Sequence, residues 1–166
     1  MVDLAARPLP RKHSAMALAT LLAVTYLVAG VSTVFTAPAI PGWYAGLAKP
    51  SFNPPNWIFG PVWTVLYTLM AIAAWLVWRR PDSAPRKAAL RLFAAQLALN
   101  FGWSILFFHC HWIGIAFVEI LTLWLTLLAA TWFFFGLSRA AGWLMVLYLA
   151  WVSFASILNY AIWRSN

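Results

Sequence analysis

The chain has 166 residues, of which 64% are hydrophobic and only 8% are charged, whereas an ordinary soluble domain has about 25% charged residues. Such a chain cannot cover a water-facing surface with polar side chains, so its composition excludes a soluble globular protein and predicts one surrounded by lipid. The formal charge of +8 does not indicate nucleic-acid binding, because the eleven Lys and Arg residues lie in short segments between apolar runs.

Five apolar segments reach the length of about 20 residues that a membrane-spanning helix needs. They predict an all-α membrane protein with a single domain, a bundle of five transmembrane helices at about residues 14–37, 58–78, 88–108, 113–135 and 142–163. The first segment follows Arg7, Arg11 and Lys12, so a cleaved signal peptide is the alternative. Its length favours a retained helix.

The segment 38–57, between the first two predicted helices, carries five of the chain's ten prolines. Proline cannot continue a helix and favours extended or turn geometry. An ordered, Pro-rich loop is therefore expected there.

Positive charge is distributed unevenly between the two ends of the predicted bundle. One end has nine Lys or Arg residues, at positions 7, 11, 12, 79, 80, 86, 87, 91 and 139, and the other end has only Lys49 and Arg164. By the positive-inside rule, the amino terminus is expected in the cytoplasm, with loop 38–57 and the carboxyl terminus in the periplasm. This predicts a protein of a bacterial inner membrane.

The third predicted helix has two different faces. Gln96, Asn100 and Ser104 recur every four residues and share one face. Because amides are costly in lipid, this face is expected to point into the bundle. A series of small residues runs along the opposite side and predicts a homodimer interface, or packing against another helix of the same chain: Ala94, Ala98 and Gly102.

Aromatic side chains follow one side of the second and fifth predicted helices. The second helix contributes Trp63 and Tyr67, followed by Met70 and Ala74, and the fifth contributes Tyr148, Trp151, Ala155 and Asn159. Ordinary packing is one interpretation. The other is a slot of indoles and amides for a planar aromatic ligand, with Ala155 leaving room beside Trp151.

Two further groups are candidates for chemistry. Glu119 is the only acidic residue deep in a predicted span, and it shares a face with Thr122 and Thr126. A functional role is possible for an intramembrane carboxylate, but a structural hydrogen bond to a Thr or an indole N–H is favoured. The segment His109–His111 has too few ligands for a closed metal site, so no metal is predicted. The histidines lie at span ends, which disfavours axial ligation of haem iron.

Several motifs occur together and in order. They occupy residues 43–57 (WYAGLAKPSFNPPNW), 61–67 (PVWTVLY), 96–103 (QLALNFGW), 148–155 (YLAWVSFA) and 158–163 (LNYAIW). The chain thereby resembles the translocator protein family, also called tryptophan-rich sensory proteins or peripheral-type benzodiazepine receptors. It departs from the family at Leu147, where proline is usual, and at His109–His111.

The resemblance implies a five-helix bundle, often dimeric, that binds porphyrins such as protoporphyrin IX, haem and isoquinoline-type drugs, with segment 38–57 as a lid. No obligatory cofactor is implied, because porphyrin or haem would be the ligand. The expected ligand-binding residues, from the resemblance and the helix faces together, are Tyr44, Pro54, Trp57, Trp63, Tyr67, Gln96, Asn100, Tyr148, Trp151 and Ala155. Leu158, Tyr160 and Arg164 match a loose sterol-recognition pattern, on which no sterol ligand is predicted.

The resulting expectation is a receptor or sensor of tetrapyrroles that regulates tetrapyrrole metabolism or a stress response. A light- and oxygen-dependent enzyme that degrades porphyrin is one alternative, because Trp63 and Trp151 match tryptophans linked to that reaction in bacterial relatives. A transporter of porphyrin or of another lipophile is the other alternative.

Overall fold

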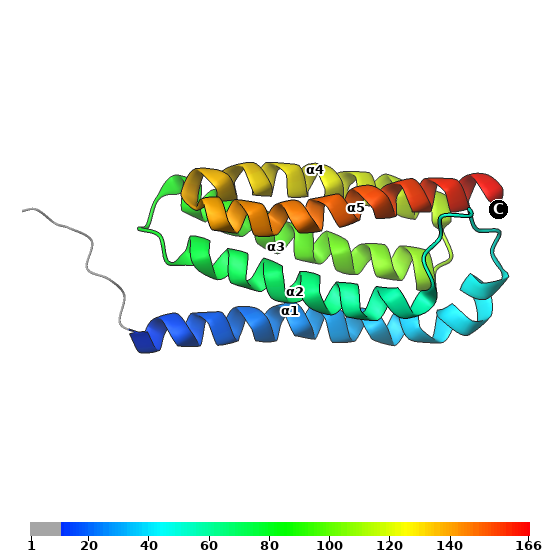
Figure 1. Cartoon of the computed structure of the whole chain (residues 1–166), viewed down its shortest axis with the longest axis horizontal. Coiled ribbons are helices and arrows are strands. Elements are labelled where there is room, and N and C mark those ends of the chain that lie inside the picture. Colours follow the sequence, from blue (N-terminus) through cyan, green and yellow to red (C-terminus); the bar gives the residue numbers. More distant parts are fainter. Residues whose placement is uncertain (1–10) are drawn as a thin grey trace, which may run out of the picture.

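A computed structural model describes residues 11–166. Its five long helices are α1 (Arg11–Ala39), α2 (Asn56–Trp78), α3 (Ala84–Ser104), α4 (Ile113–Leu137) and α5 (Arg139–Ser165), with π-helical turns η1 (Ile40–Tyr44) and η2 (Ile105–His109) after α1 and α3 (Figure 1). The described part of the chain has no strand. All five helices are long and apolar enough to cross a membrane. The prediction of an all-α, five-helix membrane bundle is confirmed.

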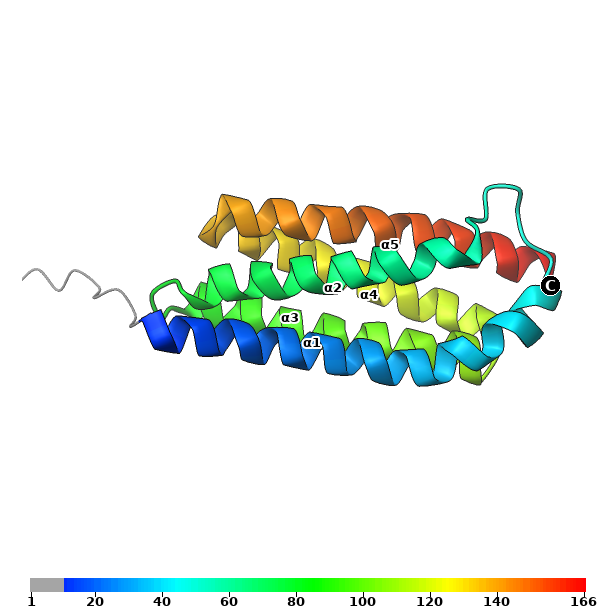
Figure 2. The ribbon, with the colours of Figure 1, turned by 60° about the horizontal axis from the view of Figure 1, so that its bottom comes forward.

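The five helices pack side by side in a closed ring. α1 packs on α2, α2 on α5, α5 on α4, α4 on α3, and α3 again on α1. Figures 1 and 2 show α1 along one edge of the bundle and the α4–α5 pair on the far side. α1 is also the least buried of the five helices. Its attachment to the bundle is therefore the weakest.

The two halves of the bundle are packed differently. In the half nearer the α2–α3 and α4–α5 turns, large side chains such as Met70, Phe134 and Met145 are fully buried in one continuous apolar core. The other half, nearer the α1–α2 connection, contains two cavities. The solid half holds the helices in place around the open half.

The end of the first helix differs from the prediction. Residues 38–57 are expected to be a loop, but α1 continues through Pro38 into η1, and non-helical chain is confined to residues 47–55. Proline removes one backbone donor and crowds the preceding turn. A π-helical turn widens the helix, and here it directly follows Pro38 and includes Pro41. The prolines thus reshape the helix end and do not stop it.

Serine caps fix the two turns at the other end of the bundle. The Ser83 hydroxyl accepts a hydrogen bond from the Arg86 backbone N–H, and the Ser138 hydroxyl accepts one from the Ala141 N–H. Both are N-caps, the position that serine favours. Beside the first cap, a hydrogen bond from Lys87 and the charge of Arg86 hold the pKa of Asp82 below its usual range. These short turns keep consecutive helices antiparallel.

Candidate functional site

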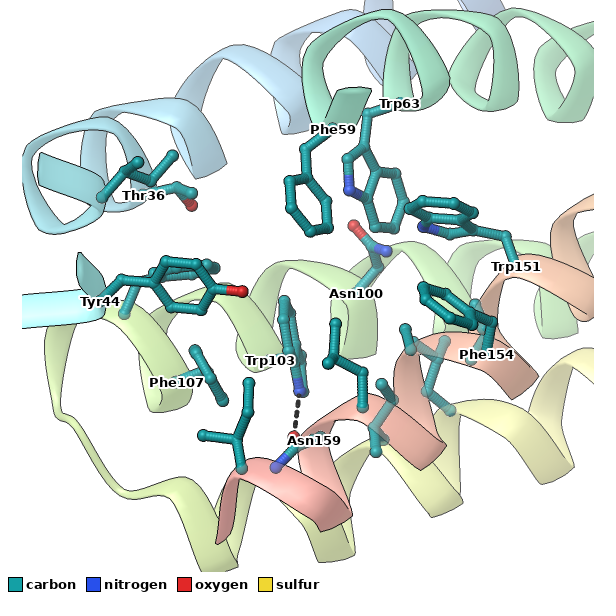
Figure 3. A pocket seen from close by; sticks show the side chains of 18 of the residues that line it. Thr36, Tyr44, Phe59, Trp63, Asn100, Trp103, Phe107, Trp151, Phe154 and Asn159 are labelled. Carbon is teal, nitrogen blue, oxygen red and sulfur yellow. Dashed lines mark hydrogen bonds between the residues drawn. The ribbon is translucent and has the colours of Figure 1, made fainter. Parts of the chain in front are cut away.

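An aromatic cavity lies inside the ring, between α2, α3, α4 and α5 and below η1. This inner cavity has a volume of about 100 Å³. Six aromatic side chains from α2, α3, η2 and α5 form much of its wall (Figure 3): Phe59, Trp63, Trp103, Phe107, Trp151 and Phe154. Ile120 and Leu123 of α4 close its far side.

A second space adjoins it, between α1, α2 and α3. This outer chamber has a volume of about 590 Å³ and is lined on the α1 side by residues from Tyr26 to Ile40. It shares several wall residues with the inner cavity, including Thr36, Phe59, Trp63 and Asn100. Small-molecule pockets typically measure about 300–1,000 Å³. The inner cavity alone is too small for such a ligand, whereas the outer chamber lies within that range.

Asn100 is the polar centre of the wall, and two tyrosines hold it. The Tyr67 hydroxyl donates to Asn100 Oδ1 at 2.5 Å, and Asn100 Nδ2 donates to the Tyr148 hydroxyl at 2.9 Å. All three side chains are buried. Because one tyrosine occupies the amide oxygen and the other the amide nitrogen, the orientation of the amide is fixed before any ligand arrives.

A second amide holds Trp103. The Trp103 indole N–H donates to Oδ1 of this amide, Asn159, at 2.9 Å (Figure 3). Asn159 Nδ2 in turn donates to the Ile113 carbonyl at 3.1 Å. Trp103 also stacks on Phe107, with ring centroids 5.0 Å apart. These contacts join α3, α5 and the start of α4 in one rigid wall.

Trp63 and Trp151 have indole N–H groups without an acceptor among the described residues. Trp63 lies tilted against Tyr67 and edge-on to Tyr148, with centroids 5.5 and 6.1 Å apart, and Trp151 is edge-on to Phe59. Within residues 11–166, neither indole N–H donates a hydrogen bond, unlike those of Trp75, Trp103 and Trp124. The two rings can therefore offer a flat ligand both stacking surfaces and hydrogen-bond donors.

The lining of the two spaces is uncharged. Every wall residue that the structure describes for the inner cavity and the outer chamber is apolar, aromatic, hydroxyl-bearing or an amide. The polar side chains gather around the outer chamber, where Ser32, Thr33, Tyr67 and Ser104 join Asn100. The site is suited to a ligand with neutral polar groups.

The connection from η1 to α2, residues 45–55, lines neither space but packs its Phe52 edge-on against Phe154 of the inner cavity, and it is called the lid. Lys49 Nζ donates to the carbonyls of Tyr44, Ala45 and Leu47 at 2.6, 3.1 and 2.8 Å, which closes the end of the first helix. The Tyr44 hydroxyl donates to Asn53 Oδ1 at 2.8 Å. The Asn166 side chain accepts from the Ala48 N–H and donates to the Ala48 carbonyl. These hydrogen bonds order the lid.

The structure brings most of the expected ligand-binding residues together. Five line the inner cavity: Tyr44, Trp63, Asn100, Trp151 and Ala155. Tyr67 and Trp57 line the outer chamber, where Trp57 is 74% exposed at its rim. Three line neither space. Tyr148 supports Asn100 from behind, Pro54 belongs to the lid, and Gln96 is buried beside Met70.

Several wall residues were not among the expected ones, notably Phe59, Trp103, Phe107 and Phe154. Trp103 follows Asn100 by three residues and thus shares its side of α3, so the helical spacing contained that signal. Phe107 follows Trp103 by four residues and stacks on it from η2, so the same spacing contained its signal as well.

The expected hydrogen bond of Glu119 is wrong. Both of its carboxylate oxygens are buried and without a partner among the described residues. Thr122 and Thr126 donate to the carbonyls of Val118 and Thr122, four residues earlier in α4. Threonine in a helix readily bonds to its own backbone in this way, so neither hydroxyl is available to Glu119.

The small-residue series of α3 lies at the bundle surface in part. Ala94 and Ala98 are exposed, whereas Gly102 is half-buried, and a Cβ on it would lie 3.8 Å from Glu119 Oε1. The homodimer remains a prediction.

The remaining candidates lie around the lid end of the bundle. His109 packs edge-on against Phe35, and His111 stacks on Trp43 with centroids 4.1 Å apart. The residues of the sterol pattern do not form one surface, because Leu158 is buried at the inner cavity while Tyr160 and Arg164 are exposed. Of the residues in the charge count, Arg7 lies outside the described residues.

Comparisons with known proteins agree with this architecture. A model of the TspO/MBR family matches residues 19–164. The chain is similar to the human translocator protein, with 42% identity over 126 residues that cover 75% of each chain. It is 38% identical to the tryptophan-rich protein TspO of Archaeoglobus fulgidus over 89% of this chain and 95% of that one. It is 41% identical to the tryptophan-rich sensory protein of Cereibacter sphaeroides over 75% and 77%.

Proposed function

The chain belongs to the TspO/MBR family of integral membrane proteins, and from that premise we propose that it is a receptor for a tetrapyrrole or a similar flat, hydrophobic ligand. The inner cavity and the outer chamber would hold this ligand, and its occupancy would regulate tetrapyrrole metabolism or a stress response.

The arrangement of Trp63, Trp151 and Asn100 is the observation that carries the proposal. Two indoles whose N–H groups donate to no described residue border the same cavity as an amide whose orientation two tyrosines fix. Stacking supplies affinity for a planar ring, and a preset amide supplies orientation without an ordering cost at binding.

The names of the relatives indicate two roles, a sensor and a carrier. One relative is called a sensory protein and another a translocator protein. We favour the receptor over the carrier, because the described wall offers a rigid binding site and no charged pathway across the bundle.

Protoporphyrin IX, titrated in the dark into protein held in lipid nanodiscs, tests this proposal. The shift of the porphyrin absorption band reports binding. Replacing both indoles, in Trp63→Leu with Trp151→Leu, is expected to weaken binding by tenfold or more, because each lost aromatic pair is worth about 0.5–1.5 kcal/mol beyond its buried area.

The matched control is Trp132→Leu with Trp143→Leu. These two tryptophans are 80% and 65% exposed on α4 and α5 and line neither space. The control is expected to bind like the parent. A parent that does not bind saturably, or a Trp63/Trp151 variant that binds equally well, would refute the proposal.

A further inference from the structure

We propose that the outer chamber is a lateral entry route, through which a lipophilic ligand with an uncharged polar group passes from the bilayer, between α1 and α2, into the inner cavity. The identity of this ligand rests on the function proposed above. The route itself rests on the geometry of the seam between the two helices.

The outer chamber connects the bundle surface with its interior. Its wall includes residues that are exposed within the apolar spans, such as Gly30, Thr33 and Thr64, and residues that are buried at the centre, such as Tyr67 and Asn100. A side chain exposed at that depth faces lipid. The chamber therefore opens to the hydrocarbon and ends at the aromatic wall.

Small residues leave the seam open. The chamber is bordered by Ala29, Gly30 and Thr33 on α1 and by Gly60 and Thr64 on α2. Thr33 and Thr64 donate to the carbonyls of Ala29 and Gly60 on their own helices, so neither hydroxyl reaches across the seam. Small residues usually let two helices approach closely, but here they border the space of about 590 Å³.

The hydrogen bonds that join α1 to α2 all lie at or beyond one end of this seam. Tyr26 Oη lies 2.6 Å from Thr68 Oγ1 and donates to the Thr64 carbonyl, and the Trp75 indole N–H donates to the Ser14 carbonyl at 2.9 Å. Between Tyr26 and the lid, the one polar contact between the two helices in the described chain is the approach of the Ser32 side chain to the Tyr67 hydroxyl, which already donates to Asn100. α1 is thus fastened in one half and can separate from α2 in the other.

The polar groups of the outer chamber indicate the class of ligand. The Ser32 side chain lines the chamber and is only 7% exposed, and within residues 11–166 its hydroxyl lies near that of Tyr67 but meets no partner in good hydrogen-bond geometry. Tyr67 and Asn100 lie farther along the same wall. A buried, unpaired hydroxyl is costly, and a neutral carbonyl or hydroxyl on the ligand would satisfy it. An ionised group would find no countercharge there.

Entry from water past the lid is the competing route. The lid is closed by the three hydrogen bonds of Lys49, by Tyr44 with Asn53, and by Asn166. Lifting the lid must break at least the two hydrogen bonds between Ala48 and Asn166 at the end of α5, whereas the described residues of the open part of the seam have no such tie. The structure favours the seam.

A photoreactive long-chain alcohol with a diazirine near its hydroxyl tests the route without any porphyrin. The alcohol is dissolved in nanodiscs that hold the full chain, and labelled residues are identified by mass spectrometry. The parent is expected to take the label at Ser32 and Tyr67. Gly60→Trp, which places an indole in the seam where a Cβ meets no atom within 4 Å, is expected to reduce that label at least fivefold.

Three further variants make the result specific. Gly30→Leu narrows the seam from α1 and is expected to act in the same direction, so the test does not depend on one variant folding. Gly136→Trp adds the same indole to α4, also in open space, and is expected to leave the label unchanged. Lys49→Met loosens the lid and is likewise expected to leave it unchanged. Equal interior labelling of the parent and both seam variants would overturn the route, as would a loss with Gly136→Trp equal to that with Gly60→Trp.

The association rate of protoporphyrin IX from preloaded membranes separates this inference from the proposed function. Gly60→Trp is expected to slow association at least fivefold, and Gly136→Trp is not. A parent that takes the photolabel at Tyr67 but binds no protoporphyrin would refute the proposed function and support the route. A Gly60→Trp variant that associates as fast as the parent would support the function and overturn the route.

Discussion

At the scale of single residues, the site depends on polar groups that other side chains hold in place. Asn100 would have several rotamers if it stood alone, but Tyr67 and Tyr148 occupy both ends of its amide. The energetic weight of this arrangement comes less from the hydrogen bonds made than from the cost of leaving a buried partner unpaired.

Tyr67→Phe is expected to destabilise the protein by about 1–3 kcal/mol, because it leaves the buried oxygen of Asn100 without a donor. The thermal midpoint in detergent measures this. Porphyrin affinity is expected to fall as well, because the amide loses its fixed orientation. Tyr160→Phe, at an exposed tyrosine of α5, is the control and should change neither quantity.

The double variant Tyr67→Phe with Asn100→Leu makes the prediction sharper. Removing both partners is expected to cost less than the sum of the two single changes, because no orphaned amide remains. Strict additivity would show that the two side chains do not interact in the membrane.

Helical spacing predicted part of the site at this scale. Trp63, Trp151 and Asn100 follow from the rule that residues four apart share a face, together with the cost of an amide in lipid. The partner of Glu119 could not be predicted in this way. Spacing shows which side chains share a face, but not that each threonine bonds to its own backbone.

At the scale of elements, the lid shows how a few polar groups replace packing. Lys49 donates hydrogen bonds to three backbone carbonyls at and just after the end of the first helix. Asn166 links the lid to the end of α5 by hydrogen bonds to Ala48. A cation at a helix carboxyl end also interacts favourably with the helix dipole.

Lys49→Met is expected to speed hydrogen exchange in residues 45–55 by about fivefold, which corresponds to roughly 1 kcal/mol of lost local stability. Exchange measured by mass spectrometry on the protein in nanodiscs checks this. Lys87→Met removes the same charge from the opposite end of the bundle and should leave the lid unchanged. If both variants exchange alike, net charge and not the capping contact controls the lid.

Packing between α4 and α5 gives a prediction about a glycine. A Cβ on Gly142 would clash with the ring of Phe135, whereas one on Gly136 would meet no described atom within 4 Å. Gly142→Ala is therefore expected to cost about 1–3 kcal/mol through overpacking. Gly136→Ala should be neutral or stabilising by up to about 1 kcal/mol.

Thermal midpoints of the two glycine variants check this contrast, and Gly142→Ala with Phe135→Leu should recover part of the loss. If Gly142→Ala is as stable as the parent, Phe135 moves aside at little cost and the contact is not rigid.

The sequence predicts that five helices exist, but not the residues at which each helix ends. Apolar length predicts five spans because the bilayer sets the length a helix needs. Pro38 predicts the end of the first helix too early, because the π-helical turn that accommodates it leaves no mark in hydropathy.

At the scale of the whole molecule, the helices close into a ring whose order differs from their order in the chain. α2 packs on α5, and α1 on both α2 and α3. Short turns predict which consecutive helices are neighbours, but no pattern within one helix shows which distant helix it will contact. The wall shared by Trp63 and Trp151 depends on that α2–α5 contact.

The unequal distribution of charge predicts the orientation of the bundle. In a Cys110→Ser background, a membrane-impermeant maleimide is expected to label Gly46→Cys, in the lid, from the periplasmic side of intact cells. Ala140→Cys, exposed at the start of α5 on the other end, should react only after lysis. The reverse pattern would show that the amino terminus is outside the cytoplasm.

An uncharged lining also makes occupancy depend on the protonation of the guest. Placing an ionised carboxylate in an apolar wall without a countercharge is very costly, so an acidic porphyrin must either keep its carboxyls in water or enter with them neutral. Apparent affinity for the free diacid should therefore decline as the surroundings become more alkaline, while the corresponding diester should show no such decline. The described lining has no titratable group other than the hydroxyls of Tyr26, Tyr44 and Tyr67. The occupancy of the site would nevertheless respond to pH, because the ligand itself gains or loses protons.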